Sequence, residues 1–295
     1  MKLMIGFILT VLACSSLGWA QEQAHYQGEL ILPDSTQYQI IETRDGSDWE
    51  GRITEISETS IRFVTKFGEM NIPIADIREI STLDMTTIKQ GKYWFPNPNT
   101  TRLFFAPTGR MLPQGEGYFA DYYVFFPSVT FGITSNFTLG GGMSLIPGVG
   151  LDNQLYFITP KIGVKASSNM HIALGLLALA IPLDDEDAFS LGILYGVGTV
   201  GSADQSMTLG LGYGYHEGNL ADKPLLVLGG EIRSSAHTAL VSENWFGGGM
   251  EGGILSFGVR FFGRRLSVDL ALALPITSEG ESFAFPYLDF VYAFK

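Results

Sequence analysis

The chain has 295 residues, of which 46% are hydrophobic and only 16% are charged, and it contains 36 glycines and one cysteine. This composition excludes a disordered chain, a disulfide scaffold and a zinc ribbon. The formal net charge of −12 disfavours a nucleic-acid partner, because a phosphate backbone needs a basic surface.

The first twenty residues carry the three parts of a secretory signal peptide. Lys2 gives a positive start, Leu3–Ala13 forms an apolar run, and Gly18-Trp19-Ala20 places small residues before a cleavage site at Gln21. The alternative is a lipoprotein signal in which Cys14 is the lipidated residue. Both alternatives predict export, and cleavage after residue 20 would leave a mature chain without a thiol, as suits an oxidising compartment.

Residues 21–90 are predicted to form a small β domain in the periplasm. Short strands are expected at Tyr38–Thr43, Trp49–Ile56, Ser60–Thr65, Glu69–Ile72 and Ile77–Ile80, with a one-turn helix at Pro73–Asp76.

The turn glycines and alternating isoleucines of this domain resemble those of SH3-like and Sm-like barrels. The matching frame runs through Asp45-Gly46, Gly51, Ile53, Ile61, Thr65, Gly68, Ile72-Pro73, Ile77 and Ile80. Sm-like folds often bind RNA, but residues 26–90 hold 12 acidic and 6 basic side chains, which argues against that partner. A scaffold or a module that contacts a periplasmic protein is the favoured interpretation.

Residues 91–100 are predicted to be a linker, because Pro96 and Pro98 cannot donate to a β ladder. Residues 101–295 are predicted to form a transmembrane antiparallel β-barrel of about twelve strands, since short turns alternate with longer connections. The short turns are expected at Thr134–Asn136, Ala166–Asn169, Gly201–Gln205, Ser234–His237 and Gly263–Arg265, and the long connections at Pro107–Glu116, Pro147–Gln154, Pro182–Asp187, Glu217–Pro224, Phe246–Gly252 and Thr277–Ser282.

Large and small side chains alternate along the expected strands. In the segment 266–276, Leu266, Val268 and Leu270 share one face, and Ser267 and Asp269 share the other. This pattern predicts lipid outside and a crowded, partly wet lumen inside, with a water-soluble barrel as the alternative. An even number of strands places both ends of the barrel on the short-turn side, which predicts a periplasmic N-terminal domain.

The hairpin around Arg264-Arg265 gives a testable register. If these two residues form the turn, Arg260 lies opposite Asp269 on the lumen face, and this ion pair is interpreted as holding the wall together. A solute path would be lined by charged residues whose signs nearly cancel: Lys161, Lys165, Glu231, Arg233, Arg260, Asp269 and Asp289. The inward glycines could instead make room for an inserted loop.

The last strand has aromatic residues at alternate positions up to Phe294. This spacing resembles the carboxy-terminal assembly signal of outer-membrane barrels, although the final residue is Lys295, and it implies recognition by the barrel-assembly machinery. The stretches 101–110, 115–118 and 131–140 resemble uncharacterised bacterial outer-membrane β-barrel proteins. This resemblance spans most of residues 100–295 and implies contact with outer-membrane lipid, but it implies no specific activity.

No catalytic motif, cofactor motif or metal-ligand spacing is found in the sequence, and His25, His171, His216 and His237 are scattered. The acidic run Asp184, Asp185, Glu186 and Asp187 is a weak candidate for a Ca²⁺ or Mg²⁺ site and is better interpreted as a solvated loop. The sequence favours a passive channel or uptake protein for small solutes. The alternatives are a closed barrel that anchors a periplasmic interaction domain or displays acidic outer loops, and a lipid-active enzyme.

Overall fold

The computed structural model describes residues 26, 28–34, 37–83, 88–89, 92–180, 191–276 and 283–294. The chain divides into two compact units, Met1–Gly91 and Lys92–Lys295. Within the described ranges, no helix is both long enough and apolar enough to cross a membrane. The expected signal peptide, His25 and the acidic run at 184–187 lie outside the described residues.

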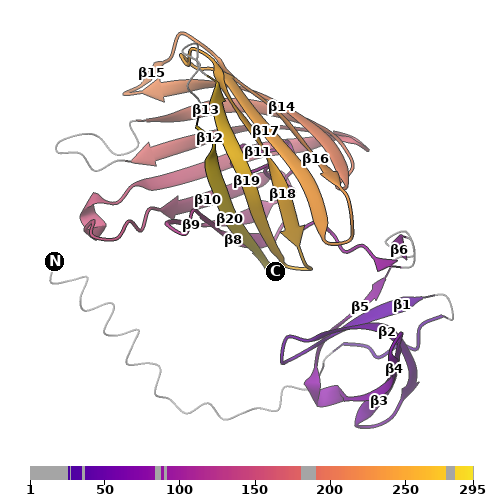
Figure 1. The fold of residues 1–295 in the computed structure, drawn as a ribbon. Helices are drawn as coiled ribbons and strands as arrows, with labels where there is room; N and C mark the ends of the chain where they lie inside the picture. Colours follow the sequence, from indigo (N-terminus) through magenta and orange to yellow (C-terminus); the bar gives the residue numbers. More distant parts are fainter. Residues whose placement is uncertain are drawn as a thin grey trace. The chain divides into compact units, whose positions relative to one another are not determined.

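The N-terminal unit is a five-stranded antiparallel sheet with the strand order β4-β3-β2-β1-β5 (Figure 1). The predicted strands and helical turn are confirmed, with ends that shift by at most one residue except at β5, which extends to Leu83. The resemblance to SH3-like and Sm-like barrels stays a prediction. The elements are β1 (Tyr38–Thr43), β2 (Asp48–Ile56), β3 (Ser60–Thr65), β4 (Gly68–Pro73), the 3₁₀ turn η2 (Ile74–Asp76) and β5 (Ile77–Leu83).

Alternating apolar residues form the core of this sheet, where Ile41, Ile53, Ile61, Phe63 and Ile77 are at most 1% exposed. They account for the fold, because burial of large apolar side chains is the main favourable contribution to folding.

The turn between β1 and β2 is built by local side-chain bonds. The Asp45 carboxylate accepts hydrogen bonds from the Thr43 hydroxyl at 2.5 Å and from the Ser47 N–H at 3.0 Å. These bonds, that of Thr43 first, lower the pKa of Asp45 below its usual value. Gly46 has a φ of 85°, which a side chain would disfavour.

The second unit is a closed antiparallel barrel of twelve strands, in which each strand pairs with the next and β20 pairs with β8 (Figure 1). The two-residue strands β6 (Ile88–Lys89) and β7 (Lys92–Tyr93) precede the wall, and β15 (Asn219–Leu220) pairs antiparallel with the end of β14. The wall strands are β8 (Gly117–Tyr122), β9 (Phe126–Thr134), β10 (Phe137–Met143), β11 (Tyr156–Ser167), β12 (Met170–Ala180), β13 (Leu191–Gly201), β14 (Gln205–His216), β16 (Leu225–Arg233), β17 (Thr238–Gly247), β18 (Gly253–Phe262), β19 (Leu266–Ile276) and β20 (Phe285–Phe294), and a 3₁₀ turn, η4 (Leu151–Asn153), lies between β10 and β11.

The predicted faces of the wall are confirmed. Leu209 on β14 is 55% exposed and Leu270 on β19 is 49% exposed, whereas their neighbours Thr208 and Asp269 are fully buried. The large apolar side chains therefore point outward and the small or polar ones point into the lumen. The five predicted short turns also join the expected pairs of strands.

The beginning of the barrel differs from the prediction. The wall starts at Gly117 rather than at residue 101, and the expected outer connection Pro107–Glu116 lies instead beside the lumen and the short-turn end. The strand number is preserved because an unpredicted turn separates β8 from β9. In this turn, Tyr123 and Val124 have φ values of 53° and 68°, a left-handed conformation that is unusual for such residues.

Candidate functional site

Residues 95–112 form a hairpin inside the barrel, here called the lumen hairpin. Its two arms are joined by hydrogen bonds from Leu103 N to Ala106 O at 2.8 Å and from Thr108 N to Thr101 O at 2.9 Å. Phe95 is buried against Ala239 and Phe262 at the start of the hairpin. The expected linker at 91–100 is therefore wrong over residues 95–99, since Phe95, Asn97 and Asn99 are at most 7% exposed.

Inward glycines make room for this hairpin, as the alternative reading of the sequence predicted. A Cβ atom added to Gly229 would lie 2.5 Å from the Leu103 side chain, and one added to Gly163 would lie 2.7 Å from the sulfur of Met111. Real Cβ atoms do not approach other atoms this closely. The lumen wall and the hairpin thus fit each other only because these wall positions carry no side chain.

Arg260 on β18 joins the wall to the hairpin. Its guanidinium binds both carboxylate oxygens of Asp269 at 2.7 Å and the Glu231 carboxylate at 2.6 Å. It also donates to the carbonyl oxygens of Asn99 at 2.7 Å and Leu103 at 2.6 Å. The predicted register is confirmed, because Arg260 lies directly opposite Asp269.

Glu243 on β17 holds the tip of the hairpin. Its Oε2 atom accepts hydrogen bonds from the backbone N–H groups of Phe104, Phe105 and Ala106, each at 2.9 Å. Its Oε1 atom accepts from the indole of Trp245 at 2.7 Å. Three successive backbone donors around one anion form a compact anion-binding nest, here filled by the protein's own side chain.

Two further cations bind hairpin carbonyl groups. The Lys161 ammonium donates to the carbonyls of Thr101 at 3.3 Å, Thr108 at 3.2 Å and Arg110 at 2.8 Å. The Arg233 guanidinium donates to the Phe95 carbonyl at 2.8 Å. All three hydrogens of the ammonium thus have an acceptor.

The predicted charged residues fall into two groups. Lys161, Glu231, Arg233, Arg260, Asp269 and Asp289 are at most 8% exposed and all take part in the hydrogen bonds of the lumen, whereas Lys165 is exposed. Within the described part of the chain, no group of three His, Cys, Asp or Glu side chains is placed to hold a metal ion.

The buried charged residues Arg102 and Glu243 take part in the network and were not predicted. Arg102 pairs with Asp289 and stacks on the ring of Tyr122, with 4.7 Å between the guanidinium carbon and the ring centroid. Glu243 shares a face of β17 with Ala239, which pairs with Arg260. Glu243 therefore lies on the face of β17 that points into the lumen. Apolar residues occupy both faces of β17, so the sequence pattern alone does not identify the inward face.

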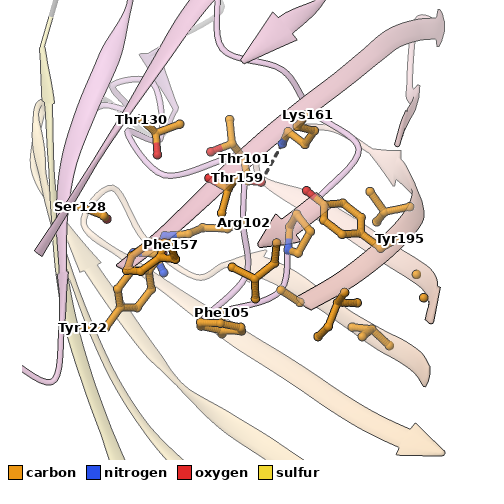
Figure 2. A pocket seen from close by; sticks show the side chains of 18 of the residues that line it. Thr101, Arg102, Phe105, Tyr122, Ser128, Thr130, Phe157, Thr159, Lys161 and Tyr195 are labelled. Atoms are coloured by element: carbon orange, nitrogen blue, oxygen red, sulfur yellow. Dashed lines mark hydrogen bonds between the residues drawn. The ribbon is translucent and has the colours of Figure 1, made fainter. Parts of the chain in front are cut away.

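A cavity of about 390 Å³ lies between the hairpin and the wall (Figure 2). Its hairpin side includes Thr101, Arg102 and Phe105. The wall side extends to Leu155 and Leu179, at the ends of strands that lead to the long connections. Such a volume is within the range of sites for small organic molecules.

No family model matches the chain, and no curated protein matches it in sequence. Among solved structures, the KdgM porin in complex with disordered oligogalacturonate is 9% identical, with 61% of this chain and 98% of the porin covered and a TM-score of 0.44. The NanC porin is 6% identical over 61% and 98% of the two chains, with a TM-score of 0.40. A variant of OmpT from Vibrio cholerae that lacks loop L8 is 11% identical over 88% and 96%, with a TM-score of 0.33. At these values the likeness assigns neither a family nor a ligand.

Proposed function

We propose that this chain is an outer-membrane barrel protein that takes up small solutes through a lumen controlled by its own hairpin. The observation that carries the proposal is the cavity of about 390 Å³ beside the hairpin, which reaches the end of the barrel where long connections begin. Buried charges and hairpin backbone occupy the lumen beside this cavity, so we expect uptake to require movement of the hairpin.

The outer face supports a membrane location. Leu209, Leu211 and Leu270 are each about half exposed, and solvation of such a continuous apolar surface by water would be unfavourable. Ten strand residues with a rise of about 3.3 Å, tilted near 45°, span about 23 Å, which matches the apolar band of outer-membrane barrels.

The lengths of the connections between strands support an orientation of the barrel in the membrane. Both ends of the wall, Gly117 and Phe294, pair with each other beside the short turns. In bacterial barrels the short turns face the periplasm, so the N-terminal unit would be periplasmic and free to meet a protein partner there. The aromatic residues before Phe294 would serve as the signal for the barrel-assembly machinery.

The lipid contact is tested by substitution of Leu270 with arginine. A charge at the depth of the bilayer centre is expected to lower the free energy of unfolding by about 2–4 kcal/mol. The matched control is Leu220→Arg, since Leu220 is 58% exposed in the connection after β14 and the expected loss near an interface is about 0–1 kcal/mol. Urea unfolding in lipid vesicles measures both, and equal losses would contradict the membrane location.

Uptake is tested with the full chain reconstituted in vesicles that contain radiolabelled neutral and acidic solutes of low mass. We expect the label to leave these vesicles slowly, but faster than it leaves vesicles without protein. Equal retention in the two preparations would contradict uptake. It would instead favour a closed barrel that anchors the N-terminal unit, a function that the buried network of the hairpin also suits.

A further inference from the structure

Several residues that line the lumen cavity carry unpartnered polar atoms. The Nε and Nη2 atoms of Arg102 and the hydroxyl oxygens of Thr101 and Thr138 have no hydrogen-bond partner, although all three side chains are at most 4% exposed. All three residues line the cavity. Buried polar groups are nearly always hydrogen-bonded, so these donors favour a ligand with acceptor oxygens. The Oδ1 atom of Asp289 also has no partner, although the other oxygen of that carboxylate binds Nη1 of Arg102.

The guanidinium of Arg102 is arranged to leave one edge free. Its Nη1 atom binds the Asp289 carboxylate at 2.5 Å, and its face stacks on the Tyr122 ring. The unpartnered Nε and Nη2 atoms share the remaining edge. Two parallel N–H groups in one plane match the two oxygens of a carboxylate, which is the geometry of the strongest arginine pairs.

Part of the cavity wall is apolar, although Ser128, Thr130 and Thr159 also line the cavity. The apolar part presents Phe157 from β11, Leu177 and Leu179 from β12, and Ile193 and Val197 from β13. Figure 2 shows Phe157 and Tyr195 on the same cavity as Arg102 and Thr101. A ligand that contacts both the unpartnered donors and the apolar residues carries an acidic group at one end and a hydrocarbon body at the other.

We propose that the cavity binds an organic acid with an apolar body, whose carboxylate pairs with the free edge of Arg102 and whose body packs on the wall of β11, β12 and β13. Thr101 and Thr138 donate their hydroxyl hydrogens to the same carboxylate. This inference names the substrate class of the proposed uptake function and rests on it. A cationic ligand would meet a guanidinium, and a neutral amide would offer one acceptor oxygen to an edge whose two N–H groups match the two oxygens of a carboxylate.

The test measures binding of 4-phenylbutyrate to the full chain in lipid nanodiscs by titration calorimetry, with empty nanodiscs as the blank. The neutral isostere 4-phenylbutanamide is titrated in parallel. We expect the acid to bind at least tenfold more tightly than the amide. Equal affinities would overturn the inference, because the carboxylate would then not be recognised.

A double variant, Arg102→Gln with Asp289→Asn, removes the guanidinium without leaving a lone buried charge. In it the affinity for the acid is expected to fall at least tenfold, to that of the amide. Leu177→Gln should lower the affinity for the acid and for the amide by the same factor. Lys223→Gln, at an exposed position, should change neither affinity. Unchanged binding of the acid in the double variant would overturn the inference.

These experiments can contradict the proposed ligand class and the proposed uptake function independently. If vesicles release neutral solutes while the acid and the amide bind alike, the substrate class is wrong and uptake stands. If the acid binds as expected while vesicles retain every solute, the site is real but the barrel is not an uptake protein.

Discussion

Replacement of Glu243 by alanine is expected to convert a nearly closed lumen into a conducting one. The backbone N–H groups of Phe104, Phe105 and Ala106 would lose their common acceptor, and Phe104 and Ala106 are at most 2% exposed. An unsatisfied buried donor costs about 1–3 kcal/mol, so the two buried donors disfavour the seated hairpin more than a single surface contact could. Planar-bilayer recording should show a conductance at least tenfold above that of the unmodified chain.

The matched control for this experiment is Asp222→Ala, which removes an exposed carboxylate from the connection between β14 and β16. It should leave the conductance unchanged. Glu243→Gln keeps one acceptor oxygen for the hairpin tip and should give an intermediate conductance. If Glu243→Ala remains folded, as judged by heat-modifiable gel mobility, and still fails to conduct, the hairpin does not close the lumen.

The sequence predicts the wall of this barrel because the wall depends on local rules. Alternation of large and small residues fixes which face is outward, and a short turn fixes the partner of each strand. The pairing of Arg260 with Asp269 follows from a single turn between neighbouring strands. In the N-terminal unit, the turn at Gly46 and the isoleucines around it are local signals of the same kind.

The contents of the lumen could not be predicted in this way. Phe104 and Phe105 have the composition of a wall strand, and their place in the lumen depends on Glu243, which lies 139 and 138 positions away in the chain. The inward glycines were a signal that space exists, but not of what fills it. The turn at Tyr123 and Val124 also escaped prediction, because both residues favour strands and neither usually adopts a positive φ.

Arg260→Ala is expected to lower the free energy of unfolding of the barrel by about 3–5 kcal/mol, because it removes one member of a buried ion network and leaves the others uncompensated. Asp269 and Glu231 are at most 5% exposed and would keep their charges without the guanidinium. The carbonyl groups of Asn99 and Leu103 would lose their donor as well. Urea unfolding in lipid vesicles, followed by heat-modifiable gel mobility, measures the loss.

A triple variant distinguishes two effects of Arg260→Ala: the uncompensated buried charges that it leaves and the hydrogen bonds to the hairpin that it removes. Replacement of Arg260, Asp269 and Glu231 together by Met, Leu and Met removes all three charges, and such exchanges of buried ion networks are often neutral or stabilising. It should recover most of the stability that Arg260→Ala loses, while Lys223→Ala, at an exposed position, should lose none. The triple variant still lacks the donors for the hairpin carbonyls, so it should be stable and yet conduct more than the unmodified chain. Full stability together with unchanged conductance would show that Arg260 holds the wall and plays no part in seating the hairpin.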